Sequence, residues 1–151
     1  MQKNILDINE ITFGEKLKNI TYFERKAVYG IVFDEGKVAA VKTPKGYFLP
    51  GGGIEKNENH TQCLEREFME EAGYEIEVGR YIGRSSLYHR SKSKRYIYAI
   101  GFFYYASLKD KINDGIEDDH ELIWMDPKEC ISSLALEHQS WAVSKSISLS
   151  R

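Results

Sequence analysis

The clearest pattern of apolar and polar positions lies in the first third of the chain. Residues 27–33 and 37–41 form two apolar runs, separated by Asp34, Glu35 and Gly36. A short turn with glycine between two such runs is typical of a β-hairpin. A weaker pattern predicts a short strand at residues 11–13, and the Gly- and Pro-rich residues 45–59 predict a loop.

The strongest helix pattern covers residues 60–72. Its apolar positions recur every four residues, at Leu64, Phe68 and Ala72, and give the helix one buried stripe. Asn59 and Gln62 have the spacing of a capping box, and Gly73 is placed to end the helix in the left-handed conformation. The pattern therefore predicts both ends of this helix as well as its buried face.

The second half of the chain alternates strands and helices. Residues 95–108 form an aromatic run that predicts a central strand, with a bend at Gly101. An acidic loop at 109–121, a short strand at 122–126, a helix opened by Pro127 and a closing helix at 136–149 follow. With no repeats and no linker, residues 1–151 are expected to form one α/β domain with mixed strand order.

Composition narrows the expected partners and location. The formal net charge is −2, so no global field attracts nucleic acid or an anionic membrane, and a phosphate-bearing ligand needs local positive charge or a metal ion. Cys63 and Cys130, the only cysteines, are expected to be free thiols in a reducing cytosol. The N-terminus is polar and no long apolar run occurs, so we expect a cytoplasmic protein. We expect it to be a monomer or a homodimer.

Three glutamates crowd one side of the predicted helix. Glu67, Glu70 and Glu71 fall within an arc of roughly 100° that adjoins the apolar stripe, and Arg66 is the one cation among them. Such a charge run is usually a solvated face, but unpaired carboxylates beside a buried stripe are costly without a cation. Carboxylate oxygens select hard divalent ions over zinc, so the alternative is a site for Mg²⁺, Mn²⁺ or Ca²⁺.

The glycine run before this helix supports the metal interpretation. Gly51, Gly52 and Gly53 follow Pro50 and let the backbone approach a phosphate or a metal ion closely. A glycine run by itself is more often only a tight turn. Together with the carboxylate arc it predicts a ligand site.

These residues resemble the Nudix box. The first glycine of that box is Gly52, the isolated glutamate is Glu58, and the remaining fixed positions are Arg66, Glu67, Glu70, Glu71 and Gly73. Phe68 and Tyr74 stand at its bulky apolar positions, of which Tyr74 is a mild departure. The resemblance covers residues 52–74 and implies the α/β/α sandwich with a mixed β-sheet that is characteristic of the family.

The resemblance also implies a reaction and roles for individual residues. Nudix hydrolases cleave nucleoside diphosphates linked to a further group X, usually with Mg²⁺ or Mn²⁺. By position, Glu67, Glu70 and Glu71 would bind the metal beside the Gly52 backbone, and Arg66 would orient a glutamate. The base would be Glu67 or an acid from another loop. The residues expected to support the loop and helix are Gly51, Gly53, Glu58 and Gly73.

Many members of the family place a further acid in a loop ahead of a Trp-containing strand. Here the candidates before Trp124 are Glu117, Asp118, Asp119 and Glu121. We expect Asp118 and Glu121 to add metal ligands; the alternative is an ordinary solvated loop.

Substrate choice follows only by elimination. Subgroup marks for ADP-ribose, NADH and coenzyme A hydrolases are absent from the sequence, which leaves a MutT-like nucleoside triphosphate pyrophosphohydrolase. The alternatives are hydrolysis of ADP-ribose, a nucleotide sugar or a dinucleoside polyphosphate, and a nucleotide-binding regulatory module without turnover.

One basic segment, residues 89–95, is the only strong positive patch. Arg90 and Arg95 are expected to contact substrate phosphates, and Tyr88 and Tyr96 to contact or stack on the nucleotide. The alternative is an exposed hairpin tip with no ligand.

Overall fold

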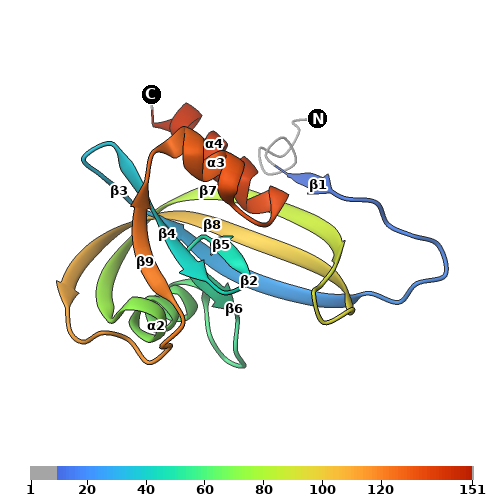
Figure 1. Cartoon of the computed structure of the whole chain (residues 1–151), viewed down its shortest axis with the longest axis horizontal. Helices are drawn as coiled ribbons and strands as arrows, with labels where there is room; N and C mark the ends of the chain where they lie inside the picture. The colour runs from blue at the N-terminus through green and yellow to red at the C-terminus, as the bar shows by residue number, and fades with distance from the viewer. Residues whose placement is uncertain (1–9, 151) are drawn as a thin grey trace, which may run out of the picture.

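The computed structural model describes residues 10–150, which form two β-sheets flanked by helices (Figure 1). The strands are β1 (Ile11–Phe13), β2 (Phe23–Ile31), β3 (Phe33–Asp34), β4 (Lys37–Thr43), β5 (Gly46–Phe48), β6 (Gly51–Gly53), β7 (Tyr74–Arg90), β8 (Tyr96–Lys111) and β9 (Glu121–Met125). The helices in the described part are α2 (His60–Ala72), α3 (Pro127–Ser133) and α4 (Glu137–Leu149).

The larger sheet has the order β1-β7-β8-β2-β6 and is mixed, because β2 runs parallel to β8 while β7 runs antiparallel to it. The aromatic strand β8 is therefore central, as the sequence predicted. The predicted bend at Gly101 is wrong: Gly101 lies in regular register with Ser85 and Ala27. A Cβ at Gly101 would fall 2.6 Å from the Phe103 ring, so the position is small for packing reasons.

The smaller sheet corrects the predicted hairpin. Only the short β3 pairs with β4 across the turn, through Phe33 with Val38 and Asp34 with Lys37. The long strand β2 leaves the pair and joins the larger sheet, while β4 pairs with β5 and β9. Residues 27–31 of β2 and 38–41 of β4 are buried on both faces, and such stretches belong inside layers rather than in an isolated hairpin.

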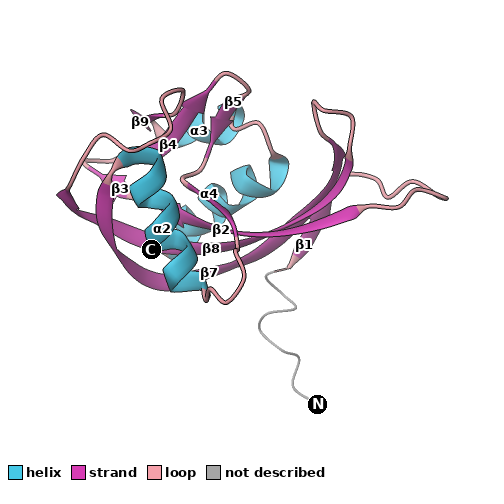
Figure 2. Ribbon diagram, turned by 90° about the horizontal axis from the view of Figure 1, so that it is seen from below, coloured by secondary structure: helices cyan, strands magenta, loops and turns pink. Residues whose placement is uncertain are grey.

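Helices cover both faces of the sheets and form an α/β/α sandwich, which confirms the predicted fold class. In Figure 1, α3 and α4 lie above the strands and α2 lies below them; Figure 2 shows α2 in front, viewed from below. Alternation along β2 sorts its side chains between two cores. Tyr29 and Ile31 pack in the cluster that includes Ala142 of α4, whereas Val28 packs with Phe68 of α2.

The predicted ends of α2 are confirmed. Asn59 and Gln62 form a complete capping box, and Gly73 ends the helix with φ of 71°. Between these caps, the buried side chains of Leu64 and Phe68 set the rotation of α2 relative to the sheet and hence the direction of its glutamates.

Within residues 10–150, no helix has the length and apolar composition needed to cross a bilayer. The expectation that the polar N-terminal segment is not a signal peptide falls largely on residues 1–9, outside the described residues.

Candidate metal and phosphate site

Helix α2 presents its glutamates toward the glycine strand β6. Leu64 and Phe68 are fully buried, and the Phe68 ring occupies the space where a Cβ of Gly30 would lie, 2.8 Å away. This close packing against β2 leaves Glu67, Glu70 and Glu71 beside the end of β6. Glu71 is only 8% exposed, which is unusual for an ionisable residue.

Arg66 ties the box together. Its guanidinium donates to both Glu58 oxygens, at 2.5 and 3.0 Å, and to the Gly53 carbonyl oxygen at 2.9 Å. It also donates to Glu70 at 3.1 Å and to Glu67 at 3.4 Å. The two bonds from Arg66 hold the pKa of Glu58 at about 2. This paired, planar contact orients the loop against the helix.

The glycines occupy a short strand instead of the irregular loop that the sequence predicted, and Gly51 and Gly52 lack a side chain for different reasons. Gly51 has φ of 139°, and its N–H donates to Glu71 Oε1 at 2.9 Å. At Gly52 a Cβ would lie 2.3 Å from Glu67 Oε2. Gly53 gives its carbonyl oxygen to Arg66. A side chain at residue 52 would therefore displace the Glu67 carboxylate, whereas a Cβ at residue 51 would lie 2.1 Å from the Val28 carbonyl oxygen of β2.

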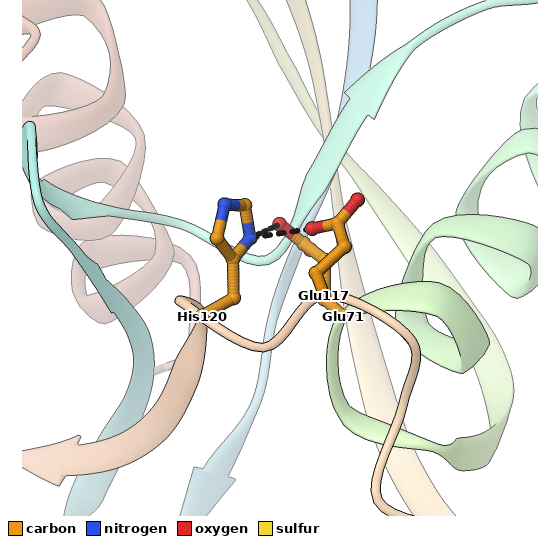
Figure 3. A group of neighbouring side chains, drawn as sticks. All are labelled: Glu71, Glu117 and His120. Atoms are coloured by element: carbon orange, nitrogen blue, oxygen red, sulfur yellow. Dashed lines mark ion pairs between the residues drawn. The ribbon is translucent and has the colours of Figure 1, made fainter.

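The acidic loop contributes Glu117 and His120 to this region, as Figure 3 shows. His120 Nδ1 lies 2.5 Å from Glu117 Oε2 and 3.4 Å from Glu71 Oε2. The oxygens of Glu67, Glu70 and Glu117 lie within 4.8 Å of one another, as do the donor atoms of Glu71, Glu117 and His120. Glu117 thus belongs to both groups.

Asp118 and Glu121, the acids expected from the sequence, are exposed and belong to neither group. The reason is a turn in which the His120 N–H donates to the Glu117 carbonyl oxygen at 3.1 Å, so that these two side chains face the helix. The sequence analysis included Glu117 among the candidate acids but selected Asp118 and Glu121, and it did not include His120. The i, i+3 spacing of Glu117 and His120 was the only signal for the pair.

Arg66 compensates only part of the negative charge of the cluster. Burial raises the pKa of Glu67 to about 7, with further raising by Glu70 and Glu117 against the lowering by Arg66. Burial raises the pKa of Glu71 to about 9, although the hydrogen bond from Gly51 opposes it. A raised pKa means that the ionised form of these carboxyl groups is unfavourable on its own. A nearby cation would stabilise that ionised form.

Two buried polar atoms without hydrogen-bond partners also indicate that a divalent cation fits these residues. Within residues 10–150, Glu117 Oε2 and His120 Nδ1 are inaccessible to solvent and, despite their short separation, form no hydrogen bond of normal geometry. Buried donor atoms without partners are rare and call for a ligand. Three or four carboxylates match Mg²⁺ or Mn²⁺, and an imidazole nitrogen among the donors favours a transition metal ion over Mg²⁺.

A cleft of about 230 Å³ opens from the carboxylates. Glu71, His120, Gly51 and Gly52 form one end, and Arg25 lies along its wall, where Nη1 donates to the Tyr29 hydroxyl at 3.4 Å. Among the described residues, no carboxylate lies within 4.0 Å of the Arg25 guanidinium. A cation without a carboxylate partner beside a metal site is suited to binding phosphate.

A larger cavity, of about 500 Å³, adjoins this cleft and shares Lys45, Phe48 and Leu136 with it. Tyr88 and Arg90 line this larger cavity. Arg95 and Tyr96 do not: Arg95 stacks on Phe23 at 4.5 Å, and Tyr96 contacts the Arg90 guanidinium at 5.3 Å. The basic segment covers the end of β7 and the turn to β8, so its position at a hairpin tip is confirmed, while its contact with a ligand stays a prediction.

Comparison with known proteins defines the class to which this fold and site belong. The sequence matches the family described as NUDIX domain over residues 24–146. The chain therefore belongs to the NUDIX family, and the resemblance read from residues 52–74 is confirmed.

Individual relatives are more distant. The chain is 31% identical to the mitochondrial Nudix hydrolase 18 of Arabidopsis thaliana over 64% of its own length and 54% of the relative's. It is 32% identical to diphosphoinositol polyphosphate phosphohydrolase 3-beta of Bos taurus over 42% and 38% of the two chains. It thus spans about half or less of the curated relatives it matches. The solution structure of the E. coli ORF135 protein aligns with a TM-score of 0.62 and 25% identity, covering 85% of this chain and 92% of that one.

Proposed function

We propose that the protein hydrolyses a nucleoside triphosphate to a nucleoside monophosphate and pyrophosphate, with Mg²⁺ or Mn²⁺ as its cofactor. The observation that carries the proposal is the convergence of Glu67, Glu70 and Glu117 to within 4.8 Å of one another. Glu71 and His120, which belong to the adjoining group, line a cleft that also contains Arg25. Nudix membership and the absence of other subgroup marks support the same reaction.

The carboxylates would hold the metal, from Glu67, Glu70 and Glu71 on α2 and Glu117 on the acidic loop, with the Gly52 backbone alongside. A divalent cation, when bound, neutralises the diphosphate oxygens and acidifies water for in-line attack. Water adds to phosphorus as the bond to the leaving phosphate oxygen breaks, and a carboxylate takes the proton. That base is Glu67 or Glu117, since both lie in the cluster.

Other chain groups would position the phosphates. Arg66 holds Glu67 and Glu70 in place through the contacts given above. Arg25 and Lys45, which line the cleft, would neutralise phosphate oxygens distant from the metal. Orientation and charge neutralisation are the main contributions that a protein makes to phosphoryl transfer.

A second candidate is a diphosphate whose X group is itself phosphorylated, such as a dinucleoside polyphosphate. The cations of the larger cavity favour it, and one relative is named for diphosphoinositol polyphosphate. Hydrolysis of ADP-ribose or a nucleotide sugar, and a binding module without turnover, remain the alternatives to be tested. A single domain over residues 1–151, a cytoplasmic location and a monomeric or homodimeric state are proposals from the sequence.

The deciding experiment is product release with Mg²⁺ or Mn²⁺ on a substrate panel. The panel contains canonical and 8-oxo nucleoside triphosphates, ADP-ribose, nucleotide sugars and dinucleoside polyphosphates. Glu70→Gln and Glu71→Gln are run beside Glu65→Gln, which changes an exposed acid of the same helix. We expect the first two variants to lose activity about 100-fold or more and the third to match the wild type.

Either of two results would contradict the proposal. No turnover of any substrate by the wild type would favour the binding module. Equal activity in all three variants would separate the glutamates from the reaction.

A further inference from the structure

The larger cavity has an apolar floor and a basic rim. Its floor includes Phe48, Leu87 and Leu136, and its rim includes Lys45, Arg90 and Lys92. A volume of about 500 Å³ lies in the usual range for a small-molecule site, and a mostly apolar wall with a few polar groups is characteristic of one.

The three rim cations come from two turns that the fold brings together. Lys45 lies between β4 and β5, whereas Arg90 and Lys92 lie at the turn between β7 and β8. The Lys92 ammonium donates to the Lys45 carbonyl oxygen at 3.1 Å and so links the two turns. Arg90 is held by the face of Tyr96. Arg90 and Lys92 are therefore each held in place by a contact with another part of the chain.

None of these cations is neutralised by a carboxylate. Within residues 10–150, no acid lies within 4.0 Å of the charged groups of Lys45, Arg90 or Lys92. Glu137 is the one acidic residue that lines the cavity. In a chain of net charge −2, this local excess of positive charge makes the cavity attractive to an anion.

We propose that this cavity is an anion subsite for the group X attached to the nucleoside diphosphate, and that it selects substrates in which X itself adds a further phosphate. The cavity and the cleft share Lys45, Phe48 and Leu136, so a ligand bound at the carboxylates extends directly into the basic rim. A neutral sugar in this position leaves three cations unpaired, whereas a phosphate pairs with them.

This inference deepens the proposed function and, in its substrate selection, rests on it. It separates the candidate substrates by charge: nucleoside triphosphates and dinucleoside polyphosphates satisfy the rim, while ADP-ribose and nucleotide sugars do not. The anion-binding part is independent of turnover, because inorganic tripolyphosphate can probe the rim in the absence of metal.

The test is isothermal titration calorimetry of the full chain with inorganic tripolyphosphate in EDTA. The variant is Arg90→Gln/Lys92→Gln, and the control is Lys37→Gln/Lys128→Gln, which removes the same charge from two exposed lysines outside the cavity. We expect the dissociation constant to rise about tenfold or more in the rim variant and to be unchanged in the control. The affinity of the wild type should fall as NaCl is raised.

A kinetic measurement tests selection with two ligands that share ADP. In the rim variant, KM for ATP should rise about tenfold, while kcat and the inhibition constant of ADP-glucose as a competitor of ATP stay constant. Equal tripolyphosphate binding in all three proteins, or no binding by the wild type, would overturn the anion subsite. An equal change in the KM for ATP and the inhibition constant for ADP-glucose would overturn the selection.

The two proposals fail separately. Binding that depends on Arg90 and Lys92 without turnover of any nucleotide retains the subsite and removes the proposed function. Turnover of ATP together with tripolyphosphate binding that does not depend on Arg90 and Lys92 retains the proposed function and removes the subsite.

Discussion

Gly52 leaves room for the carboxylate of Glu67: a Cβ at residue 52 would fall 2.3 Å from Glu67 Oε2 and 2.6 Å from its carboxyl carbon. The atoms in the way are the end of a side chain, and Gly52 has no positive φ, so the backbone itself tolerates alanine. A side chain at residue 52 would therefore displace the Glu67 carboxylate more than it would disturb the fold.

The first prediction follows from that geometry. Gly52→Ala should displace Glu67 and lower kcat/KM about 100-fold, while Tm changes by only a few degrees. Gly53→Ala is the matched control, because its Cβ would meet nothing closer than an Arg25 nitrogen at 3.4 Å. Steady-state kinetics and thermal unfolding of both variants check the prediction. Comparable activity in the two variants would count against a catalytic role for the Glu67 position.

Arg66 gives the second prediction. Arg66→Lys retains the charge but loses the paired contact with Glu58. We therefore expect the free energy of unfolding to fall by about 1–2 kcal/mol. We also expect kcat/KM to fall about tenfold or more. The control is Arg84→Lys, whose exposed pair with Glu10 at 3.0 Å should contribute less than about 1 kcal/mol. Urea unfolding measures both. A loss in Arg84→Lys as large as in Arg66→Lys would refute the special role of Arg66.

The third prediction concerns His120 as a metal ligand. Electron spin echo measurements on the Mn²⁺-loaded protein should detect coupling to a ¹⁴N nucleus, since the expected donor set contains an imidazole. His120→Gln should abolish that coupling and weaken Mn²⁺ binding about tenfold or more. His60→Gln provides the control, because His60 bonds Tyr104 instead of the carboxylates. A nitrogen signal that persists in His120→Gln would exclude His120 as the ligand.

A fourth prediction links stability to acid through His138. Burial lowers the pKa of His138 to about 3, and the side chain is 1% exposed. The unfolded chain has an ordinary histidine pKa of about 6.5, so below that pH it binds a proton that the folded protein excludes. The contribution of His138 is thus fully present above about pH 6.5 and declines as pH falls toward 3.

From pH 7.5 to pH 5, this difference amounts to about 2 kcal/mol. Urea unfolding at several pH values should show a shallower loss of stability in His138→Gln than in the wild type. Because carboxylates also titrate in this range, the difference between the two proteins is the quantity to compare. Identical slopes would show that His138 is not kept neutral by burial.

The glutamate helix could be predicted almost completely from local sequence. Its apolar stripe, its capping box and its terminal Gly73 are separated by only a few residues, and the side-chain positions on a helix follow from its regular geometry. The same regularity placed Glu67, Glu70 and Glu71 on one side of the helix.

The pairing of strands within the two sheets could not be predicted from local sequence. The apolar runs at 27–33 and 37–41 indicated buried strands, but apolar periodicity does not specify which strand lies alongside. The structure pairs β2 with β8 and β4 with β9, at sequence separations that no local pattern encodes.

The acidic loop shows the same limit at the level of single residues. Four acids precede Trp124, and composition alone does not rank them. A turn between Glu117 and His120 directs these two side chains toward Glu71 and leaves Asp118 and Glu121 exposed. Loop conformation depends on what the loop packs against, and here that surface is a helix more than 40 residues earlier in the chain.

By itself, the sequence determined the α/β class, the family and the carboxylates of α2, because these rest on contacts between near neighbours. Only the tertiary structure decided which loop acid joins them and which cations surround the adjoining cavity. Lys45, Arg90 and Leu136 lie on three distant segments. Their proximity results from packing β5, the β7–β8 turn and α4 together, and the burial of apolar surface between those elements provides the free energy that holds them there.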